Sequence, residues 1–346
     1  MVKPLVLWKD ACFKPNMEFR TVWKPEPSSW KVDHQSPVLT LGSCFAERTG
    51  GRLYNCHIPV SVNPWGTLFH PLLMERLMME ALHRQRPELD PFLQEGDRVV
   101  SLLYPSWFRA ETTEELSAQI QETHTYIADN ISAYSYLILT LGTAWVYQHR
   151  NSGKLVAACH KAPAREFDKI LLKPEEVILS IHNLVRAVRQ FQPHIKVILT
   201  VSPVRHTRDT IPLNAVSKSV LRYACHELTQ DPKVFRYFPA YEILMDDLRE
   251  YRFYGEDMIH PNSVAEQYIF ERFSETFFSE STREINEAIE SLQQGLAHKP
   301  RVKGSEWTKH LERMLDQIER LEKEYSIRLD RERQKLLQLI EGQQIF

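Results

Sequence analysis

Three polar residues have the types and spacing of a catalytic serine with its base. Ser43 lies in LTLGSCFA (39–46), where a short apolar run meets a helix-forming segment. Asp257 and His260 lie three residues apart in YGEDMIHPN (254–262). A serine hydroxyl needs a base to take its proton, and a neighbouring carboxylate can orient an imidazole for this task. These residues therefore indicate acyl transfer through a serine nucleophile.

The elements around Ser43 decide whether it can act. The apolar residues 37–42 predict a strand, and residues 44–54 are expected to form a helix directly after it. A serine at such a turn exposes its hydroxyl, and the helix N-terminus favours negative charge that develops beside it. Cys44 is an alternative nucleophile, because a thiolate at a helix N-terminus is activated, but a small buried cysteine is the commoner case.

The loop that carries Asp257 and His260 is expected to be held firmly. Ser263 and Glu266 follow it with the spacing of a capping box. This spacing predicts that a helix begins just after His260. The carboxylate and the imidazole can then face one common site.

Strands and helices alternate along most of the chain. We predict apolar strands at 37–42, 57–62, 134–142, 196–203 and 233–239, helices at 44–54, 71–85, 174–192, 214–229, 240–250 and 262–280, and a hairpin at 144–160. Such alternation is typical of a parallel sheet covered by helices on both faces. The expected fold is therefore α/β, with a doubly wound parallel sheet.

Ligands of an open parallel sheet bind at the carboxyl ends of its strands. The further candidates there are Asn63, Gly66, Gly142, Thr143, Arg205 and His206. His206 fits a second base, a substrate contact or a structural histidine. Arg205 fits either a contact to an anionic substrate or an ion pair with an acidic residue of 242–247. Trp65 and Trp145 suit stacking on a sugar ring, or a hydrophobic lid.

The composition is that of a globular protein. Of the 346 residues, 43% are hydrophobic and 25% are charged, and the net charge is −2. This balance gives no electrostatic reason to bind nucleic acid or an anionic membrane. The N-terminal residues lack a signal-peptide pattern, and no apolar run approaches the ~18 residues of a membrane span. We therefore expect a cytoplasmic protein.

The metal-binding residue types lack the usual spacings. The five cysteines are scattered without CxxC spacing, which argues against a disulfide framework and a zinc site. The histidines near predicted strand ends, His70, His160, His206 and His260, form no HxH or HExxH pattern. We predict no metal and no other cofactor.

The two ends of the chain differ from its middle. Residues 1–36 are rich in Pro, Trp and Lys and predict an extended arm, followed by the α/β domain at 37–297. Residues 298–346 predict a linker and a charged amphipathic helix, with apolar residues at 311, 315, 318, 321, 325, 329, 336 and 340. This stripe fits either a coiled coil that forms a homo-oligomer or a helix packed on its own domain.

Several segments resemble the GSCFA family. The matching pieces are LTLGSCFAERTGGRLY (39–54), NPWGTLFHP (63–71), LTLGTAWVY (139–147), CHKAP (159–163), TVSPVRHTRDTIPLNAVSKSVLRYACHEL (200–228) and YFPAYEILMDDLREYRFYGEDMIHPN (237–262). That family is similar to the wider SGNH (GDSL-like) hydrolases, which have a flavodoxin-like fold. The resemblance implies that Ser43 is the nucleophile and that Asp257 and His260 are the acid–base pair.

The resemblance also implies an oxyanion hole. SGNH enzymes draw its donors from the backbone N–H of the nucleophile, a glycine in the second block and an asparagine in the third. Ser43 fits the first role and Gly66 the second, with Asn63 nearby. The third block here is LGTAW, without an asparagine, so Thr143 or its backbone, beside Gly142, would have to serve.

Together these observations predict a serine esterase that hydrolyses ester-linked acyl groups. By family analogy the expected substrate is an O-acetylated carbohydrate or another small ester. Two alternatives remain: an O-acyltransferase with the same triad, and a non-catalytic binding or scaffold protein that assembles through its C-terminal helix.

Overall fold

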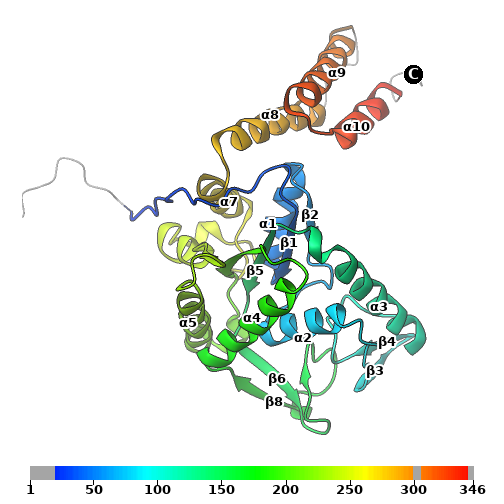
Figure 1. The fold of residues 1–346 in the computed structure, drawn as a ribbon, viewed down its shortest axis with the longest axis vertical. Helices are drawn as coiled ribbons and strands as arrows, with labels where there is room; N and C mark the ends of the chain where they lie inside the picture. The colour runs from blue at the N-terminus through cyan, green and yellow to red at the C-terminus, as the bar shows by residue number, and fades with distance from the viewer. Residues whose placement is uncertain (1–19, 299–304, 342–346) are drawn as a thin grey trace, which may run out of the picture.

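The structure is a computed structural model that describes residues 20–298 and 305–341. Its centre is a five-stranded sheet (Figure 1). The strands are β1 (Val38–Gly42), β2 (Val60–Val62), β5 (Tyr136–Leu141), β9 (Lys196–Val201) and β10 (Phe235–Tyr237), in the order β10-β9-β5-β1-β2. All neighbouring pairs are parallel. This is the flavodoxin-like order, with its switch point between β1 and β5, and it confirms the predicted doubly wound sheet.

Alternate strand residues face two helical layers. One layer consists of α2 (Pro71–Leu82), α3 (Thr113–Asn130), α4 (Pro174–Arg189) and α5 (Ile211–Leu228), and the other contains α1 (Cys44–Asn55) and α7 (Ser263–Phe277) (Figure 1). Leu39 and Leu41 of β1 pack with the first layer, while Val38 packs with the second. Because both faces of the central strands β1, β5 and β9 are buried, their sequences are mostly apolar rather than alternating.

Two small antiparallel sheets extend the domain. The hairpin predicted at 144–160 is present as β6 (Trp145–His149) and β7 (Leu155–Val156), but β8 (Phe167–Leu171) adds a third strand to it. The sequence analysis did not anticipate β8. It also missed the hairpin of β3 (Phe92–Glu95) with β4 (Arg98–Ser101), as well as helix α3.

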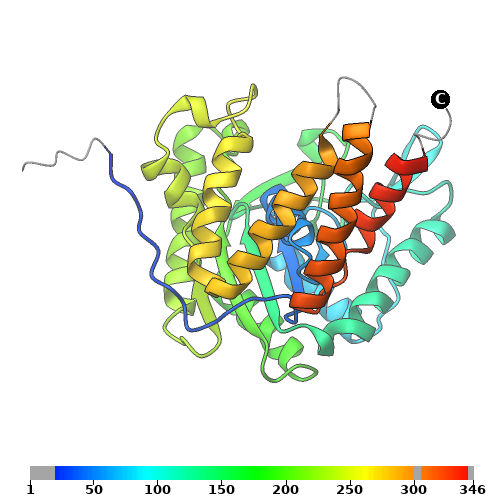
Figure 2. The ribbon, with the colours of Figure 1, turned by 90° about the horizontal axis from the view of Figure 1, so that it is seen from above.

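The C-terminal segment forms a layer of three helices (Figure 2). These are α8 (Glu280–Ala297), α9 (Ser305–Tyr325) and α10 (Asp330–Glu341). The prediction of a single helix after the linker is wrong. Helix α9 ends at Tyr325, and the chain turns at Ser326, where φ is +53°. The predicted apolar stripe, including Leu311, Ile318 and Leu329, is buried against α8 within the chain. Most of the predicted linker lies outside the described residues.

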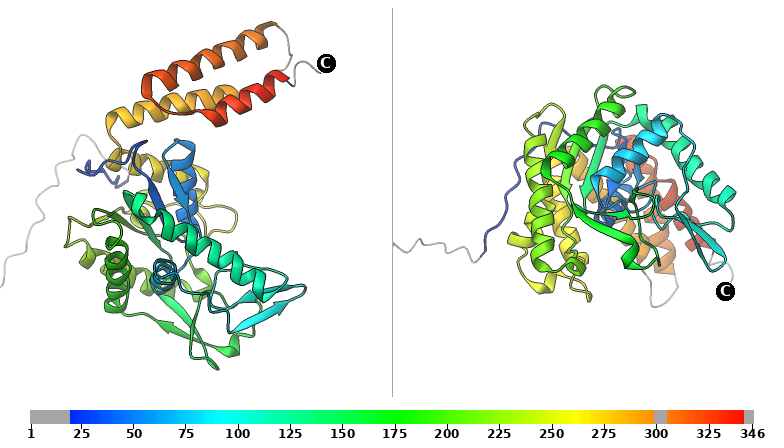
Figure 3. Two further views of the ribbon diagram at one scale, coloured as in Figure 1. Left: turned by 45° about the vertical axis from the view of Figure 1, so that its right-hand side comes forward. Right: turned by 90° about the horizontal axis from the view of Figure 1, so that it is seen from below.

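The helical layer covers the amino end of the sheet. Arg331 donates to the Tyr54 carbonyl (2.7 Å) and Gln293 donates to the Asn55 carbonyl (3.0 Å), at the last turn of α1. The three helices therefore lie at one end of the sheet, and the carboxyl ends of its strands lie at the other. The small sheet that contains β6 and β8 is on the side of the carboxyl ends (Figures 1 and 3). No helix in the described ranges is long and apolar enough to cross a membrane.

Of the predicted N-terminal arm, residues 20–36 are described, and they run extended along α7. The Ser28 N–H donates to the Thr276 carbonyl and the Val32 N–H donates to the Phe277 carbonyl, each at 2.8 Å. Trp30 and Val32 are buried. The arm is thus held by backbone hydrogen bonds and by apolar contacts.

The chain after β10 corrects the helix predicted at 240–250. A short helix, α6 (Ala240–Glu242), passes into one π-helical turn over Ile243–Asp247. The buried Asp247 carboxylate accepts hydrogen bonds from the Trp23 N–H (3.2 Å) and the Tyr268 hydroxyl (2.8 Å). These tertiary contacts accompany an irregular turn that local helix propensity does not foresee.

Candidate active site

Ser43 occupies the turn between β1 and α1. It is the N-cap of α1, and its buried Oγ accepts a hydrogen bond from the Phe45 N–H (3.3 Å). Gly42 before it has φ +147°, and a Cβ there would overlap the Thr140 carbonyl oxygen. Only glycine can therefore bring the end of β1 this close to β5. This accounts for the Gly-Ser pair at the end of the strand.

A second glycine completes the surroundings of Ser43. A Cβ on Gly142, at the end of β5, would lie 3.4 Å from the Ser43 Cβ and 2.8 Å from the Phe69 carbonyl oxygen. The Ser43 N–H itself donates to the Thr140 carbonyl (3.1 Å). Ser43 thus lies at the switch point of the sheet, packed against the backbone of the neighbouring strand.

Asp257 and His260 form a close pair. The distance from His260 Nδ1 to Asp257 Oδ2 is 2.6 Å. The other carboxylate oxygen accepts the N–H groups of Ile259 (2.9 Å) and His260 (3.0 Å). The hydrogen bonds from His260, backbone and side chain, and from Ile259 lower the pKa of Asp257 to about 2. The carboxylate is therefore ionised at neutral pH and keeps the imidazole proton on Nδ1, which leaves Nε2 as the acceptor.

The loop of this pair is braced on both sides. The Gly255 N–H donates to the His260 carbonyl (2.8 Å), and Tyr254 forms a β-bridge with Pro261. The predicted helix start is correct to within a few residues, but the cap is wrong. Asn262 is the N-cap and accepts from the Ala265 N–H, while Ser263 is already helical. Asn262 also donates to the Arg252 carbonyl (2.7 Å), so it braces the loop as well.

The two halves of the site share one end of the sheet but are not bonded to each other. The Arg205 N–H, just beyond β9, donates to the Ile259 carbonyl (3.2 Å) and ties the loop to that strand end. In the described chain no hydrogen bond joins Ser43 Oγ to His260. Ser43 is fully buried, whereas the His260 side chain is 51% exposed.

His206 follows β9 and packs against Phe69, with 5.8 Å between the ring centroids. It is half-buried, and its buried Nε2 has no hydrogen-bond partner among the described residues. Burial and the nearby charges of Lys218 and His260 lower the pKa of His206 to about 3. His206 is therefore neutral at physiological pH, and its position beside the site fits a contact to substrate better than it fits a cation.

Among the described residues Arg205 makes none of the ion pairs considered from the sequence, which were with Glu242, Asp246 or Asp247. Its guanidinium lies over the rings of Tyr251 and Tyr254, 5.9 and 5.5 Å from their centroids. Asp247 pairs with Arg20 at 3.6 Å and Glu242 pairs with Arg222 at 2.7 Å. Arg205 thus supports the loop of His260 by stacking on its tyrosines.

The residues considered for the oxyanion hole are all engaged within the protein. Asn63 Nδ2 donates to the Gly42 carbonyl (3.1 Å), and the Gly66 N–H donates to the Asn63 carbonyl (2.6 Å). The N–H groups of Gly142 and Thr143 both donate to the Phe69 carbonyl, at 3.0 and 2.9 Å. The Thr143 hydroxyl contacts the Ser217 hydroxyl (3.0 Å). An oxyanion would have to displace one of these acceptors.

Cys44, Trp65 and Trp145, which were also considered from the sequence, are wholly or partly buried within the protein. Burial raises the pKa of Cys44, so its thiol stays protonated and is a poor nucleophile. Trp65 is fully buried and cannot stack on a sugar. Trp145 is half-buried, donates from Nε1 to the Leu213 carbonyl (3.2 Å) and lies under the Lys169 ammonium. No group of His, Cys, Asp or Glu side chains in the described ranges is arranged to hold a metal ion.

An exposed tryptophan near the site escaped the sequence analysis. Trp107 is 72% exposed, and its Cβ and Cγ lie against Gly66, 3.0 and 3.4 Å from where a Cβ on that glycine would be. The flanking residues Tyr104 and Phe108 are buried. The alternation of exposed and buried aromatics in YPSWF (104–108) is the feature that could have indicated it.

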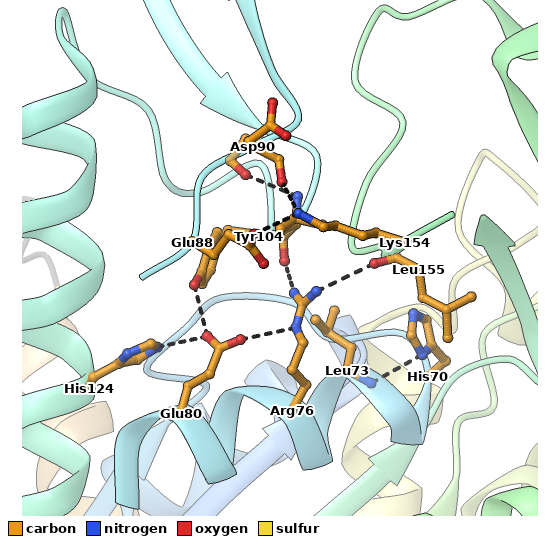
Figure 4. A network of polar contacts seen from close by, with 12 residues as sticks. His70, Leu73, Arg76, Glu80, Glu88, Asp90, Tyr104, His124, Lys154 and Leu155 are labelled. Atoms are coloured by element: carbon orange, nitrogen blue, oxygen red, sulfur yellow. Dashed lines mark hydrogen bonds and ion pairs between the residues drawn. The ribbon is translucent and has the colours of Figure 1, made fainter. Parts of the chain in front are cut away.

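A buried polar network holds the segment that carries Trp107 (Figure 4). Arg76 of α2 donates to the carbonyls of Leu103 and Leu155, and the Tyr104 hydroxyl donates to Glu80 Oε2 (2.8 Å). His124 Nε2 lies 3.8 Å from the same carboxylate oxygen. Burial lowers the pKa of His124 to about 4, so it is neutral there. The network fixes residues 103–104 on α2.

Lys218 is a further residue near the site that was not predicted from the sequence. This residue of α5 is 1% exposed, and its Nζ donates to the carbonyls of Gly142 (2.8 Å) and Ser202 (2.7 Å). Burial lowers the pKa of Lys218 to about 7. Its place on the helical stripe shared with Leu221 and Cys225, at spacings of three and seven, could have indicated that it points inward.

Two cavities lie away from the candidate site. One of about 430 Å³ is enclosed by residues of α1, α7 and α8, and one of about 440 Å³ lies beside the N-terminal arm. Neither is lined by Ser43, Asp257 or His260. These two cavities therefore do not belong to the candidate site.

Comparison with known proteins gives one family match. The model of the GSCFA family matches residues 37–273, which include every candidate residue from Ser43 to His260. No curated protein matches the chain.

Similar solved structures include a carbohydrate esterase family 3 protein from Talaromyces cellulolyticus, with 9% identity over 74% of this chain and 99% of that chain and a TM-score of 0.36. A second is a carbohydrate esterase family 2 enzyme with a carbohydrate binding domain from Corynascus thermopiles (Myceliophthora fergusii), with 11% identity over 76% and 68% of the two chains and a TM-score of 0.36. A third is a family two carbohydrate esterase from Clostridium thermocellum in complex with cellohexaose, with 12% identity over 77% and 66% and a TM-score of 0.31.

Proposed function

The chain belongs to the GSCFA family, and from that premise we propose that it is a serine esterase. Ser43 is the nucleophile, His260 the general base and Asp257 the residue that orients the imidazole. The observation that carries the proposal is the 2.6 Å contact between His260 Nδ1 and Asp257 Oδ2, on a loop tied to the same end of the sheet as Ser43. A carboxylate held ionised beside a histidine is the arrangement that a serine nucleophile requires.

The proposed reaction has two halves. Ser43 Oγ attacks the ester carbonyl while His260 Nε2 takes the hydroxyl proton; the proton then passes to the departing alcohol, and an acyl-serine remains. Water attacks this acyl group, His260 takes a proton from the water, and the carboxylic acid leaves as Ser43 regains its hydrogen. Asp257 stays ionised throughout and stabilises the imidazolium.

This chemistry requires a rearrangement. His260 Nε2 must come within hydrogen-bond reach of Ser43 Oγ, which in this conformation accepts a hydrogen bond from the Phe45 N–H. For the oxyanion we propose the N–H groups of Ser43 and Gly66, with Thr143 in place of the missing asparagine. Each must turn from its internal acceptor as substrate enters. Catalytic hydrogen bonds often form only in the substrate complex.

For the substrate we propose an O-acylated carbohydrate. Trp107 supports this choice, because an exposed indole beside Gly66 offers a flat apolar face to a sugar ring at the proposed oxyanion loop. Fold alone does not select a substrate. The proposal of a carbohydrate substrate therefore depends on Trp107 rather than on the fold of the sheet.

Covalent labelling tests the proposal. A fluorophosphonate probe should label the purified wild-type protein, and peptide mapping should place the adduct on Ser43. Ser43→Ala should abolish labelling, and His260→Ala should slow it strongly. The matched control is Ser152→Ala, because Ser152 Oγ lies 3.0 Å from His149 Nδ1 and is a hydrogen-bonded serine–histidine pair outside the site. This control should label like the wild type.

Two outcomes would redirect the proposal. A wild-type protein that is not labelled and hydrolyses neither p-nitrophenyl acetate nor acetylated xylan is a binding or scaffold protein, and the esterase proposal fails. Labelling at Ser43 with turnover that appears only after a sugar acceptor is added identifies an O-acyltransferase instead of a hydrolase.

A further inference from the structure

Lys218 is a buried amine with unusual partners, and because its pKa is lowered to about 7 it is partly protonated at neutral pH. Its Nζ donates to two backbone carbonyls, those of Gly142 and Ser202, which lie just beyond β5 and β9. No carboxylate pairs with it in the described chain. Its charge interacts with the titratable groups Cys44 of α1 and His206, and the Tyr241 ring centroid lies 5.8 Å away. A lysine without a counter-ion is rare in a protein interior.

Such a residue is costly to keep. Burying an ammonium group is unfavourable because it removes the hydration of the charge, and two neutral carbonyls recover only part of this loss. A methionine or leucine at this position of α5 would fill similar space without the penalty. The placement therefore calls for a use of the charge or of the hydrogen bonds.

The bonded carbonyls point to that use. Gly142 lies against the Cβ of Ser43, and its carbonyl belongs to the peptide unit whose N–H is that of Thr143. The Ser202 carbonyl follows β9, three residues before the Arg205 N–H that holds the His260 loop. Lys218 thus joins the strand end beside the serine to the strand end that supports the histidine.

We propose that Lys218 is a positioning residue of the proposed active site, which holds the backbone at Gly142 and Ser202 so that Ser43 and the loop of His260 keep their relative placement. This inference rests on the proposed function. The ammonium also polarises the Gly142–Thr143 peptide unit and makes the Thr143 N–H a stronger donor. Lys218 touches no reacting atom in this scheme.

The test uses the rate at which a fluorophosphonate labels Ser43, with Lys218→Met and Lys218→Ala compared with the wild type. We expect both variants to label about 10²-fold more slowly, the loss typical of a small misplacement of reacting groups. In hydrolysis of p-nitrophenyl acetate, kcat should fall while KM changes little. Lys154→Met is the control, because Lys154 also donates to a backbone carbonyl, that of Asp90 (2.9 Å), outside the site.

Chemical rescue separates positioning from a general loss of structure. Propylamine replaces the atoms that Lys218→Ala removes, so it should restore the labelling rate at least tenfold in that variant and leave the wild type unchanged. Propanol has the same length without the charge and should restore little. Labelling is the better readout here, because an amine can also intercept an acyl-enzyme.

The outcomes are distinguishable. A wild type that labels while Lys218→Met labels equally fast overturns this inference and leaves the proposed function intact. Slow labelling of both variants without rescue by propylamine also overturns it, since the lysine would then serve only packing. An unlabelled wild type overturns the proposed function, and this inference with it.

Discussion

The two oxygens of Asp257 have separate tasks. Oδ2 lies 2.6 Å from His260 Nδ1, while Oδ1 accepts the N–H groups of Ile259 and His260. The imidazole and the backbone that carries it are therefore fixed by one carboxylate. A base oriented in this way has one accessible nitrogen, Nε2, for a substrate or for Ser43.

Asp257→Asn should reduce kcat for p-nitrophenyl acetate by roughly 10³–10⁴-fold. The amide can hydrogen-bond to Nδ1 but neither stabilises the imidazolium nor keeps the proton on Nδ1. Steady-state kinetics at pH 7.5 measure the loss. The matched control is Asp168→Asn, which removes an exposed carboxylate paired with Arg150 and should leave kcat unchanged. Equal activity of both variants would show that Asp257 has no catalytic part.

The stability of the protein should respond to the charge of Lys218. The pKa of this lysine is about 7 when folded, against an ordinary value of 10.5. Between these values the unfolded chain binds more protons than the folded one, so the unfolding free energy rises with pH. The unfolding free energy of the wild type should therefore rise, relative to that of Lys218→Met, by up to about 1.4 kcal/mol per pH unit from pH 7 to 10. Urea denaturation at several pH values measures the difference, and a constant difference contradicts the shift.

Gly42→Ala should destabilise the protein by roughly 2–4 kcal/mol, because a Cβ there meets the Thr140 carbonyl oxygen and φ is +147°. Gly51→Ala is the control. Gly51 is helical with open space around its Cβ position, so alanine should stabilise α1 by up to ~1 kcal/mol. Chemical denaturation of both variants gives the comparison. A stable Gly42→Ala protein would mean that β1 and β5 can separate at their ends.

Trp107→Ala should raise KM for acetylated oligosaccharides about tenfold, the value of one lost aromatic stacking contact. It should leave hydrolysis of p-nitrophenyl acetate unchanged, because that ester has no sugar ring. The control is Tyr223→Ala, which removes another exposed aromatic residue, 52% exposed on α5. If KM does not move, the carbohydrate part of the proposed function is wrong while the esterase part stands.

The sheet could be predicted from the sequence because its central strands β1, β5 and β9 are buried on both faces. The run at 37–42 matches β1 within one residue, and Pro71 marks the start of α2 as expected. The hairpin of β3 and β4 and the strand β8 were missed, since they are short and partly exposed and therefore lack a clear apolar run. Short elements at the edge of a fold depend on tertiary contacts.

The candidate residues could be found from their types and spacing. Which of them are buried and which are exposed could not be predicted from the sequence. Ser43 and His260 lie at the expected end of the sheet, yet burial of one and exposure of the other depends on loop packing. Lys218 was missed because lysine is normally a surface residue. Asn262, rather than Ser263, caps α7, because both residue types cap well and only the loop geometry selects between them.

The C-terminal helices dock on the last turn of α1, through contacts such as that of Arg331 with the Tyr54 carbonyl. A protein attached to a support through these helices would therefore stand with the carboxyl ends of its strands and the exposed Trp107 turned away from the support. Polymers much larger than the protein could then reach this side without meeting the support, so the outer surface of the three helices is a suitable place for attachment.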